Sequence, residues 1–179
     1  MRIISGEYKG KQIVPDSKLA IRPTTDFAKE GLFNILSNSY DMSLYDILDL
    51  FSGTGSISYE FASRGCGVIH AVEIDARNVA FIRETSKKLG LSQFRVIRDD
   101  VFHFLSICKI QFDIIFADPP FEMPKTENIP ALVFERNILK PEGILILEHS
   151  KRTNFTGHEH LYDHRHYGNV HFSFFKRRV

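Results

Sequence analysis

Asp118, Pro119, Pro120 and Phe121 follow directly on the apolar run 112–117, and their types suit chemistry on a planar amine. The exocyclic nitrogen of a nucleobase is a weak nucleophile, because its lone pair is delocalised into the ring. A carboxylate oxygen and a proline-flanked carbonyl can accept hydrogen bonds from its two N–H groups and aim the nitrogen. Successive prolines keep such a loop extended, and the aromatic ring offers a stacking surface for the base. The structural alternative is that Asp-Pro-Pro ends a strand and turns the chain.

A glycine-containing turn forms the second motif. The segment 49–55, Asp-Leu-Phe-Ser-Gly-Thr-Gly, comes out of an apolar run and leads into a segment with helical periodicity. Glycines at a strand-to-helix turn let the backbone approach a ligand closely, and the start of the helix supplies free N–H donors. A dinucleotide site would have a third glycine where this chain has Ser58, which disfavours NAD. A lone Gly-x-Gly is a weak signal, so its weight depends on the residues that follow.

Acidic residues stand at the ends of the next two predicted strands. Glu73 follows the run 68–72, where a carboxylate can accept hydrogen bonds from both hydroxyls of a ribose. Asp100 comes shortly after the run 94–97 and is placed to take the amino group of an adenine. Parallel strands bring these acids to one edge of the sheet, the edge at which open α/β folds bind ligands. Asp75 is expected to be a solvated loop residue or a helix cap.

Short apolar runs alternate with longer segments of helical periodicity, which predicts a parallel sheet covered by helices on both faces. The expected strands are 47–51, 68–72, 94–97, 112–117 and 144–147. The expected helices are 25–38, 55–64, 76–89, 101–108 and 128–139. Thr24 or Thr25 is available as the N-cap of the first helix. Gly168-Asn169 is a turn signal for an antiparallel hairpin that joins 159–165 to 170–177.

Length and composition indicate one globular domain over residues 1–179, with a short basic hairpin or arm at 1–22 and a core at 23–179. No apolar stretch approaches the roughly 18 residues of a membrane helix, and the first residues lack the apolar core of a signal peptide. A cytoplasmic protein is therefore expected. Cys66 and Cys108 have no metal-type spacing and are expected to be buried, reduced thiols.

Charge is distributed unevenly along the chain, although the net charge is only +1. Residues 1–22 contain five Lys/Arg and two acids, and residues 150–179 contain six and two, so the middle carries −6. Basic ends suggest contact with a polyanion, and chance is the alternative. Five of the eight histidines lie between 158 and 171, but their spacing does not build a known metal site, so surface histidines are expected there. His149 is expected to be oriented by a hydrogen bond in the core.

Taken together, these motifs resemble those of the class I S-adenosylmethionine-dependent methyltransferases. The resemblance implies a Rossmann-like α/β fold, with a mostly parallel seven-stranded sheet, an antiparallel C-terminal strand and helices on both faces. It implies that the loop 49–55 wraps around the methionine part of the cofactor, with Glu73 on the ribose and Asp100 on the adenine. The cofactor-binding residues it implies are Thr25, Asp49, Phe51, Ser52, Gly53, Thr54, Gly55, Glu73, Ile74, Asp100, Val101 and Asp118.

A narrower resemblance covers nearly the whole chain. The segments 2–6, 22–26 and 32–36 are similar to the opening of the bacterial RsmD family, and Arg-Pro-Thr-Thr-Asp at 22–26 is the most specific match. That family methylates the N2 amine of a guanine in 16S rRNA of the small ribosomal subunit. The chain departs from its pattern at Lys29, where arginine is usual, and at Phe121, where tyrosine is commoner. The resemblance implies that the chain acts on 16S rRNA or on a small-subunit particle. A monomer without a metal is expected.

These resemblances assign roles to the remaining candidates. Asp118 and the Pro119 carbonyl are expected to hold the guanine amine, with Pro120 shaping the loop and Phe121 stacking on the base. The residues expected to contact RNA phosphates, all on one side of the sheet edge, are Arg2, Lys9, Lys11, Arg22 and Lys29. The alternatives are methylation of adenine N6 in DNA or RNA, methylation of a glutamine side chain, and a nucleotide-binding module without catalysis.

Overall fold

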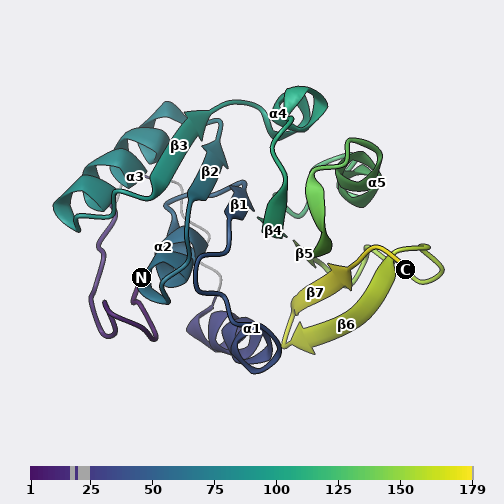
Figure 1. Ribbon diagram of the computed structural model, residues 1–179, viewed down its shortest axis with the longest axis horizontal. Helices are drawn as coiled ribbons and strands as arrows, with labels where there is room; N and C mark the ends of the chain where they lie inside the picture. Colours follow the sequence, from purple (N-terminus) through teal and green to yellow (C-terminus); the bar gives the residue numbers. More distant parts are fainter. Residues whose placement is uncertain (17–18, 20–24, 179) are drawn as a thin grey trace.

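The structure, a computed structural model, describes residues 1–16, 19 and 25–178 (Figure 1). Seven strands form one sheet in the order β3-β2-β1-β4-β5-β7-β6. The strands are β1 Ile47–Leu50, β2 Ile69–Glu73, β3 Phe94–Arg98, β4 Phe112–Ala117, β5 Leu139–His149, β6 Leu161–Tyr167 and β7 Val170–Phe175. The helices are α1 Asp26–Ser39, α2 Ser56–Ser63, α3 Ala76–Lys88, α4 Val101–Ile107 and α5 Asn128–Glu135.

The topology confirms the expected fold class. β1 to β5 are parallel, and β7 is inserted between β5 and β6, antiparallel to both. The carboxyl ends of β1 to β5 therefore meet at one edge of the sheet. Because the loops after β1, β2, β3 and β4 carry the candidate site residues, this arrangement collects them in one place.

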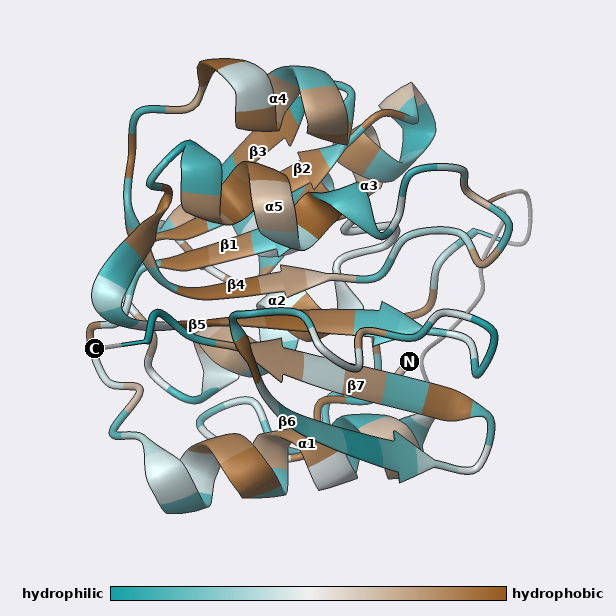
Figure 2. Cartoon of the chain, turned by 90° about the vertical axis from the view of Figure 1, so that its right-hand side faces the viewer, coloured by the Kyte–Doolittle hydropathy of each residue, from teal (hydrophilic) through white to brown (hydrophobic). Residues whose placement is uncertain are grey.

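Two hydrophobic layers cover the sheet. Successive residues of the central strands alternate between them: Ile47 and Phe116 belong to the layer under α1, α2 and α3, and Leu48 and Ile115 to the layer under α4 and α5. Figure 2 shows the apolar central strands between these helices and the polar edge strand β6. Because the central strands are buried on both faces, they read in the sequence as continuous apolar runs.

The boundary between α5 and β5 differs from the sequence prediction. The helix expected over 128–139 ends at Glu135, and the strand expected over 144–147 begins already at Leu139. Asn137 has φ of 57°, a left-handed conformation that stops a helix. The pairing of β5 with β4 is irregular between Phe112 and Ile114, and Gly143 is required there because a Cβ would lie 2.9 Å from the Asp113 carbonyl oxygen. The predicted helix was therefore too long at its C-terminal end, and the predicted strand was too short.

The N-terminal residues form the expected short hairpin. Arg2 bridges to Gln12, and the Ile13 amide donates to the Met1 carbonyl at 2.9 Å. The hairpin lies along α2, and at Gly6 its backbone touches the end of that helix: φ is 82° and a Cβ would lie only 1.8 Å from the Ser63 carbonyl oxygen. Only glycine fits such a close approach.

Two remaining expectations concern the cysteines and the membrane. Both cysteines are free thiols, as expected; Cys66 is buried as predicted, whereas Cys108 is only half-buried. Within the described part of the chain, no helix combines the length and the apolar character that crossing a membrane would require.

Candidate active site

The glycine turn after β1 is held from inside by a serine. The Ser52 hydroxyl donates to the carbonyls of Asp49 at 2.7 Å and Val72 at 3.2 Å, which ties the turn to β2. Gly53 and Gly55 have φ of 53° and 84°, so both need the left-handed region that glycine adopts freely. A Cβ at Gly53 would meet open space, with 4.0 Å to its nearest atom. The turn therefore exposes backbone, and not side chain, to the space above it.

Asp49 lies beneath this turn and is only 1% exposed. The Ser58 hydroxyl donates to its carboxylate, so the serine that replaces the third glycine of a dinucleotide motif has a structural partner. Burial raises the pKa of Asp49 and the Ser58 hydrogen bond lowers it; with smaller raising effects from the nearby Asp118 and Glu73 carboxylates, the net pKa is about 7. Asp49 is thus a supporting residue for the site, placed under the loop and close to two of its acids.

This raised pKa predicts a pH dependence of stability. The folded pKa of about 7 lies above the ordinary value of 3.8, so the folded state retains a proton that the unfolded state releases. The contribution of Asp49 is fully present below about pH 4 and is lost as the pH rises to about 7. The Asp49→Asn variant has no carboxyl group to titrate at this position. Its free energy of unfolding, measured with urea, should therefore fall less between about pH 4 and pH 7 than that of the unmodified protein. Parallel pH profiles would contradict the assignment.

Glu73 connects the ends of β1 and β2. Its Oε2 accepts from the Gly53 amide and its Oε1 from the Asp75 amide, both at 2.8 Å, and the side chain is largely buried. The two oxygens retain further lone pairs that can accept hydroxyl groups of a ligand. Asp75 caps α3 and pairs with Arg77 at 2.9 Å, which confirms its expected role as a helix cap.

Asp100 and Val101 stand where β3 passes into α4. The Asp100 carboxylate caps this helix by accepting from the His103 amide at 2.9 Å, and Val101 is buried as its first residue. The neighbouring Asp99 pairs with His103 at 2.9 Å and leaves Asp100 on the cavity side. The cap fixes the Asp100 side chain in position.

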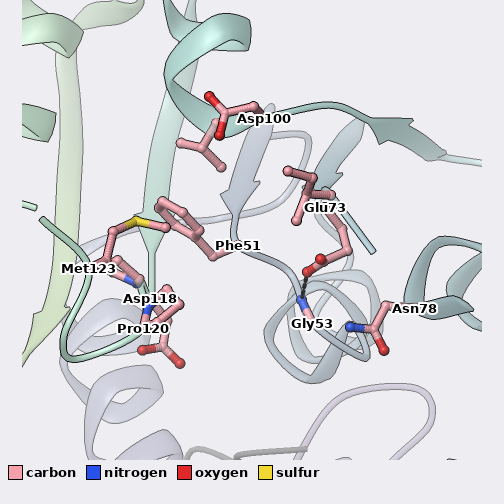
Figure 3. Close-up of a pocket in the computed structure, with 11 residues that line it drawn as sticks. Phe51, Gly53, Glu73, Asn78, Asp100, Asp118, Pro120 and Met123 are labelled. Atoms are coloured by element: carbon pink, nitrogen blue, oxygen red, sulfur yellow. Dashed lines mark hydrogen bonds between the residues drawn. The ribbon is translucent and has the colours of Figure 1, made fainter. Parts of the chain in front are cut away.

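One cavity of about 360 Å³ brings these elements together at the carboxyl edge (Figure 3). This volume lies in the range of small-ligand sites. Its lining residues are Phe51, Gly53, Glu73, Ile74, Asn78, Asp100, Val101, Asp118, Pro119, Pro120 and Met123. Figure 3 shows Asp100 and Glu73 above Asp118 and Pro120, which come from the acceptor loop. The cavity thus joins the expected cofactor residues to the expected acceptor residues.

Several predicted residues lie outside this lining. Asp49 and Ser52 support the turn from below, and Thr54 is nearly buried, with its hydroxyl 3.7 Å from the Met1 sulfur. Thr25 caps α1 by accepting from the Ala28 amide at 3.2 Å, as expected of an N-cap. Gly55 and Phe121 are likewise not among the lining residues. For these six, a direct cofactor or base contact stays a prediction.

Asn78 and Met123 line the cavity but were missed in the sequence. Met123 closes the acceptor loop, since its amide donates to the Pro120 carbonyl at 2.8 Å. Asn78 stands in the first turn of α3, five residues after Glu73. In the sequence, these two residues could have been found only from their closeness to Glu73 and to the Asp-Pro-Pro motif. Whether their side chains face the cavity depends on the orientation of α3 and of the acceptor loop.

The acceptor loop leaves β4 at Asp118. β4 lies beside β1, and Leu50 pairs with Ala117, so Asp118 and the glycine turn leave adjacent strands. Pro119 is buried, whereas Asp118 and Phe121 are half-buried and Pro120 is exposed. The Thr126 hydroxyl donates to the Met123 carbonyl at 3.0 Å and secures the far end of the loop. Asp118 and Pro119 are thereby placed in the wall of the cavity.

Lys29 is a correction to the expected RNA surface. Its side chain is buried, and the ammonium donates to the Arg2 carbonyl at 2.7 Å and to the Ser56 hydroxyl at 3.3 Å, with Glu60 at 4.0 Å. Burial lowers its pKa. A residue enclosed in this way is inaccessible to a phosphate, so Lys29 instead joins the N-terminal hairpin to the start of α2.

The other expected RNA contacts are not all on one side of the sheet edge. Arg2 lies near the site, 3.9 Å from Asp26 at the start of α1. The tip of the hairpin is remote, because the Tyr8 hydroxyl donates to the Leu89 carbonyl just beyond the last turn of α3. A helix of 13 residues is about 20 Å long, so Lys9 and Lys11 lie at the end of the molecule away from the cavity. Arg22 is outside the described residues.

The histidines gather on β5, β6 and β7. His149 is buried, with Nε2 at 2.8 Å from the Ser173 hydroxyl and Nδ1 at 2.8 Å from the Ser150 carbonyl, which confirms the expected core hydrogen bond. His164 Nε2 lies 3.1 Å from His171 Nδ1 on the neighbouring strand. Among residues 1–16, 19 and 25–178, no three His, Cys, Asp or Glu side chains are grouped so that they could hold a metal ion.

The structural neighbours of this chain are class I methyltransferases. The chain superposes on a protein from Escherichia coli described as "Putative methyltransferase yhhF" with a TM-score of 0.86 at 26% identity, over 100% of this chain and 98% of that one. It superposes on a hypothetical protein from Thermus thermophilus with a TM-score of 0.87 at 25% identity, over 99% of each. The chain therefore has the class I methyltransferase fold.

The family follows from the sequence comparisons. The family model described as "Conserved hypothetical protein 95" matches residues 1–176, and the chain belongs to this family. "Ribosomal RNA small subunit methyltransferase D" of Buchnera aphidicola subsp. Baizongia pistaciae is 32% identical over 154 residues, 86% of this chain and 78% of the relative. The protein of the same description from Haemophilus influenzae is 33% identical over 155 residues, 84% of this chain and 79% of that protein. The resemblance to the RsmD family is thereby confirmed.

Proposed function

We propose that this protein transfers a methyl group from S-adenosylmethionine to the N2 amine of a guanine in 16S rRNA of the small ribosomal subunit. The observation that carries the proposal is the shared cavity, in which Gly53, Glu73 and Asp100 adjoin Asp118 and Pro119. A site for an adenosine-containing cofactor thus opens onto an acceptor loop suited to a planar amine. The names of the relatives supply the RNA class, since both are described as small-subunit rRNA methyltransferases.

The residues present fit the cofactor. Glu73 has free lone pairs for ribose hydroxyls, and Asp100 lines the same cavity, where its carboxylate can accept from an adenine amino group. Phe51, Ile74 and Val101 supply apolar surface for the purine ring. The open space above Gly53 leaves room for the rest of the nucleoside and for the methionine part.

The chemistry follows from charge and position. S-adenosylmethionine supplies a methyl group that is already activated on a sulfonium centre, so no covalent nucleophile of the protein is required. Asp118 and the Pro119 carbonyl accept hydrogen bonds from the two N–H groups of the guanine amine and direct its lone pair along the line of transfer. Formation of the bond from nitrogen to the methyl carbon would break the carbon–sulfur bond of the donor and release S-adenosylhomocysteine. The Asp118 carboxylate would stabilise the positive charge that develops on the nitrogen and take up the proton that the nitrogen then releases. Phe121 stacks on the extruded base.

A transfer assay tests the substrate class. The protein and labelled S-adenosylmethionine are incubated together in four separate reactions, which contain naked 16S rRNA, small ribosomal subunits, duplex DNA or a protein mixture. Incorporation into the rRNA, free or in subunits, is expected to exceed incorporation into DNA and protein by at least about a hundredfold. Equal labelling of DNA, or labelling of protein alone, would contradict the proposal. Calorimetry with S-adenosylmethionine and NAD tests the cofactor, and only the former is expected to bind.

A further inference from the structure

A row of histidines crosses the sheet beside the acceptor loop, and the proposed function does not use it. His149 on β5 pairs with His171 on β7, which in turn pairs with His166 on β6. The ring centroids of the first pair are 5.8 Å apart and those of the second 5.6 Å, so the three imidazoles stand side by side on one face. His164 lies on the same face of β6, two residues before His166, and its Nε2 is 3.1 Å from the His171 Nδ1. These four residues are called the histidine row.

The register of the sheet places the histidine row next to the acceptor loop. Ala117 at the end of β4 pairs with Leu147 on β5, and two residues further along the two chains stand Pro119 and His149. His149 lies on the same face as Leu147, which is the face covered by α5, the helix to which the acceptor loop leads. Because neighbouring strands are about 4.8 Å apart, the row runs from about 5 Å to about 15 Å from β4. Figure 2 shows the hydrophilic end of β5, with β6 beyond it, at the edge to which β4 points.

The outer part of the row is open to solvent. His149 is buried and His171 is half-buried, whereas His164 and His166 are exposed. Lys151, just beyond the end of β5, is exposed as well. A ligand that approaches the acceptor loop along the sheet can therefore reach the imidazoles of β6 and β7 and the ammonium of Lys151.

The charged groups around the inner rings are cations. Burial lowers the pKa of His171, and the positive charges of His164, His166 and Lys151 lower it further. Burial also lowers the pKa of His149, with a smaller effect of the same sign from His164 and His171. The hydrogen bond between His164 and His171 requires that one of the two facing nitrogens carries no proton. An anion among these rings would offset their mutual repulsion and favour their protonated forms.

The acidic side chains of the same strands do not face the row. Asp163 and Arg165 alternate with His164 and His166 along β6, so they point to the opposite face, where they pair with each other at 2.9 Å. Glu148 is likewise buried on the opposite face of β5. The charge of the row is thus suited to an anion.

We propose that the histidine row binds backbone phosphates of the RNA next to the target guanine and takes up a proton when it does so. Phosphate oxygens accept hydrogen bonds from the imidazole N–H groups and from the Lys151 ammonium. The pKa of a ring that contacts a phosphate is higher in the complex than in the free protein, so binding is coupled to protonation. The affinity for RNA therefore increases as the pH falls from about 8 to about 6, the range in which histidine titrates. This inference rests on the proposed function for RNA as the substrate.

The experiment compares RNA binding by variants at two pH values. Filter binding gives the dissociation constant of a naked 16S rRNA transcript at about pH 6 and about pH 8, at one salt concentration. The double variant His164→Gln/His166→Gln removes the two exposed rings, and His166→Arg places a permanent positive charge in the row. Lys87→Gln, which removes an exposed charge in the last turn of α3, is the matched control. All of these proteins retain Asp49, whose pKa is about 7, so differences between their pH profiles arise from the row.

The expected result is a pH dependence that disappears with the exposed rings. The unmodified protein and Lys87→Gln should bind the transcript about tenfold more tightly at the lower pH, whereas the double variant should change by less than about threefold. His166→Arg should bind more tightly than the unmodified protein at about pH 8. The single-turnover rate of methyl transfer at saturating RNA should be the same in the double variant as in the unmodified protein, because the row does not touch the reacting nitrogen.

The contradicting outcomes separate the inference from the proposed function. If the double variant and the unmodified protein have the same pH profile, or if the loss appears in the rate at saturating RNA, the inference alone is overturned. If the unmodified protein neither binds nor methylates the rRNA, the proposed function is refuted, and the inference with it.

Discussion

Replacement of Asp118 by alanine is expected to lower the rate of methyl transfer to 16S rRNA by on the order of a thousandfold. The carboxylate holds one N–H of the acceptor amine and stabilises the positive charge that develops on nitrogen. Both interactions are stronger in the transition state than in the ground state, so their loss lowers the rate constant and not mainly the affinity. Single-turnover assays with labelled S-adenosylmethionine measure this rate.

The affinity for the cofactor distinguishes a catalytic role of Asp118 from a structural one. Glu73, Asp100 and Gly53 remain in Asp118→Ala, so the dissociation constant of S-adenosylmethionine is expected to change by less than about threefold. Asp41→Ala is the matched control, since Asp41 is exposed and its carboxylate bonds to Ser43, outside the cavity lining. It should leave both quantities unchanged. Substantial transfer by Asp118→Ala would remove the acceptor loop from the mechanism.

The largest effect on stability is expected for Glu60→Ala, with a loss of about 3–5 kcal/mol in the free energy of unfolding. Glu60 is fully buried, and its carboxylate accepts from the amides of Ile4 at 2.8 Å and Ser5 at 3.1 Å. Arg64 lies at 2.9 Å from it and Lys29 at 4.0 Å. Alanine would leave the Lys29 ammonium buried without its anion and would release the N-terminal hairpin from α2. Urea unfolding followed by circular dichroism measures the loss.

An exposed ion pair provides the control for this substitution. Glu84 and Lys88 pair at 2.7 Å on α3, with side chains 67% and 71% exposed. Surface pairs of this kind contribute little, so Glu84→Ala should cost no more than about 0.5 kcal/mol. Similar losses in the two variants would show that the buried network around Glu60 does not hold the hairpin.

The sequence predicted those parts of the site that depend on topology. Gly53, Glu73, Asp100 and Asp118 each stand at or just after the end of a strand, and parallel strands bring such positions to one edge wherever the helices lie. The end of α5 was not predictable in this way. Ile138 and Leu139 continue the apolar periodicity of the helix, so nothing in the pattern marks the left-handed turn before them.

Residues whose environment depends on distant partners could not be predicted. Lys29 reads as a surface cation, and its burial depends on Glu60 and on the hairpin, which are separate in the sequence. The remote position of Lys9 and Lys11 depends on the contact between Tyr8 and Leu89. In the sequence Asn78 looks like an ordinary helix residue, because its position in the cavity wall depends on how α3 is oriented against the glycine turn.

Nucleoside analysis of the reaction product tests the central proposal most directly. Small ribosomal subunits from cells lacking the corresponding methylation are incubated with the protein and methyl-labelled S-adenosylmethionine. The 16S rRNA is digested to nucleosides and analysed by mass spectrometry. The proposed function predicts that the label elutes as N2-methylguanosine and is absent with Asp118→Ala. Label in N6-methyladenosine, or none in the rRNA, would contradict it.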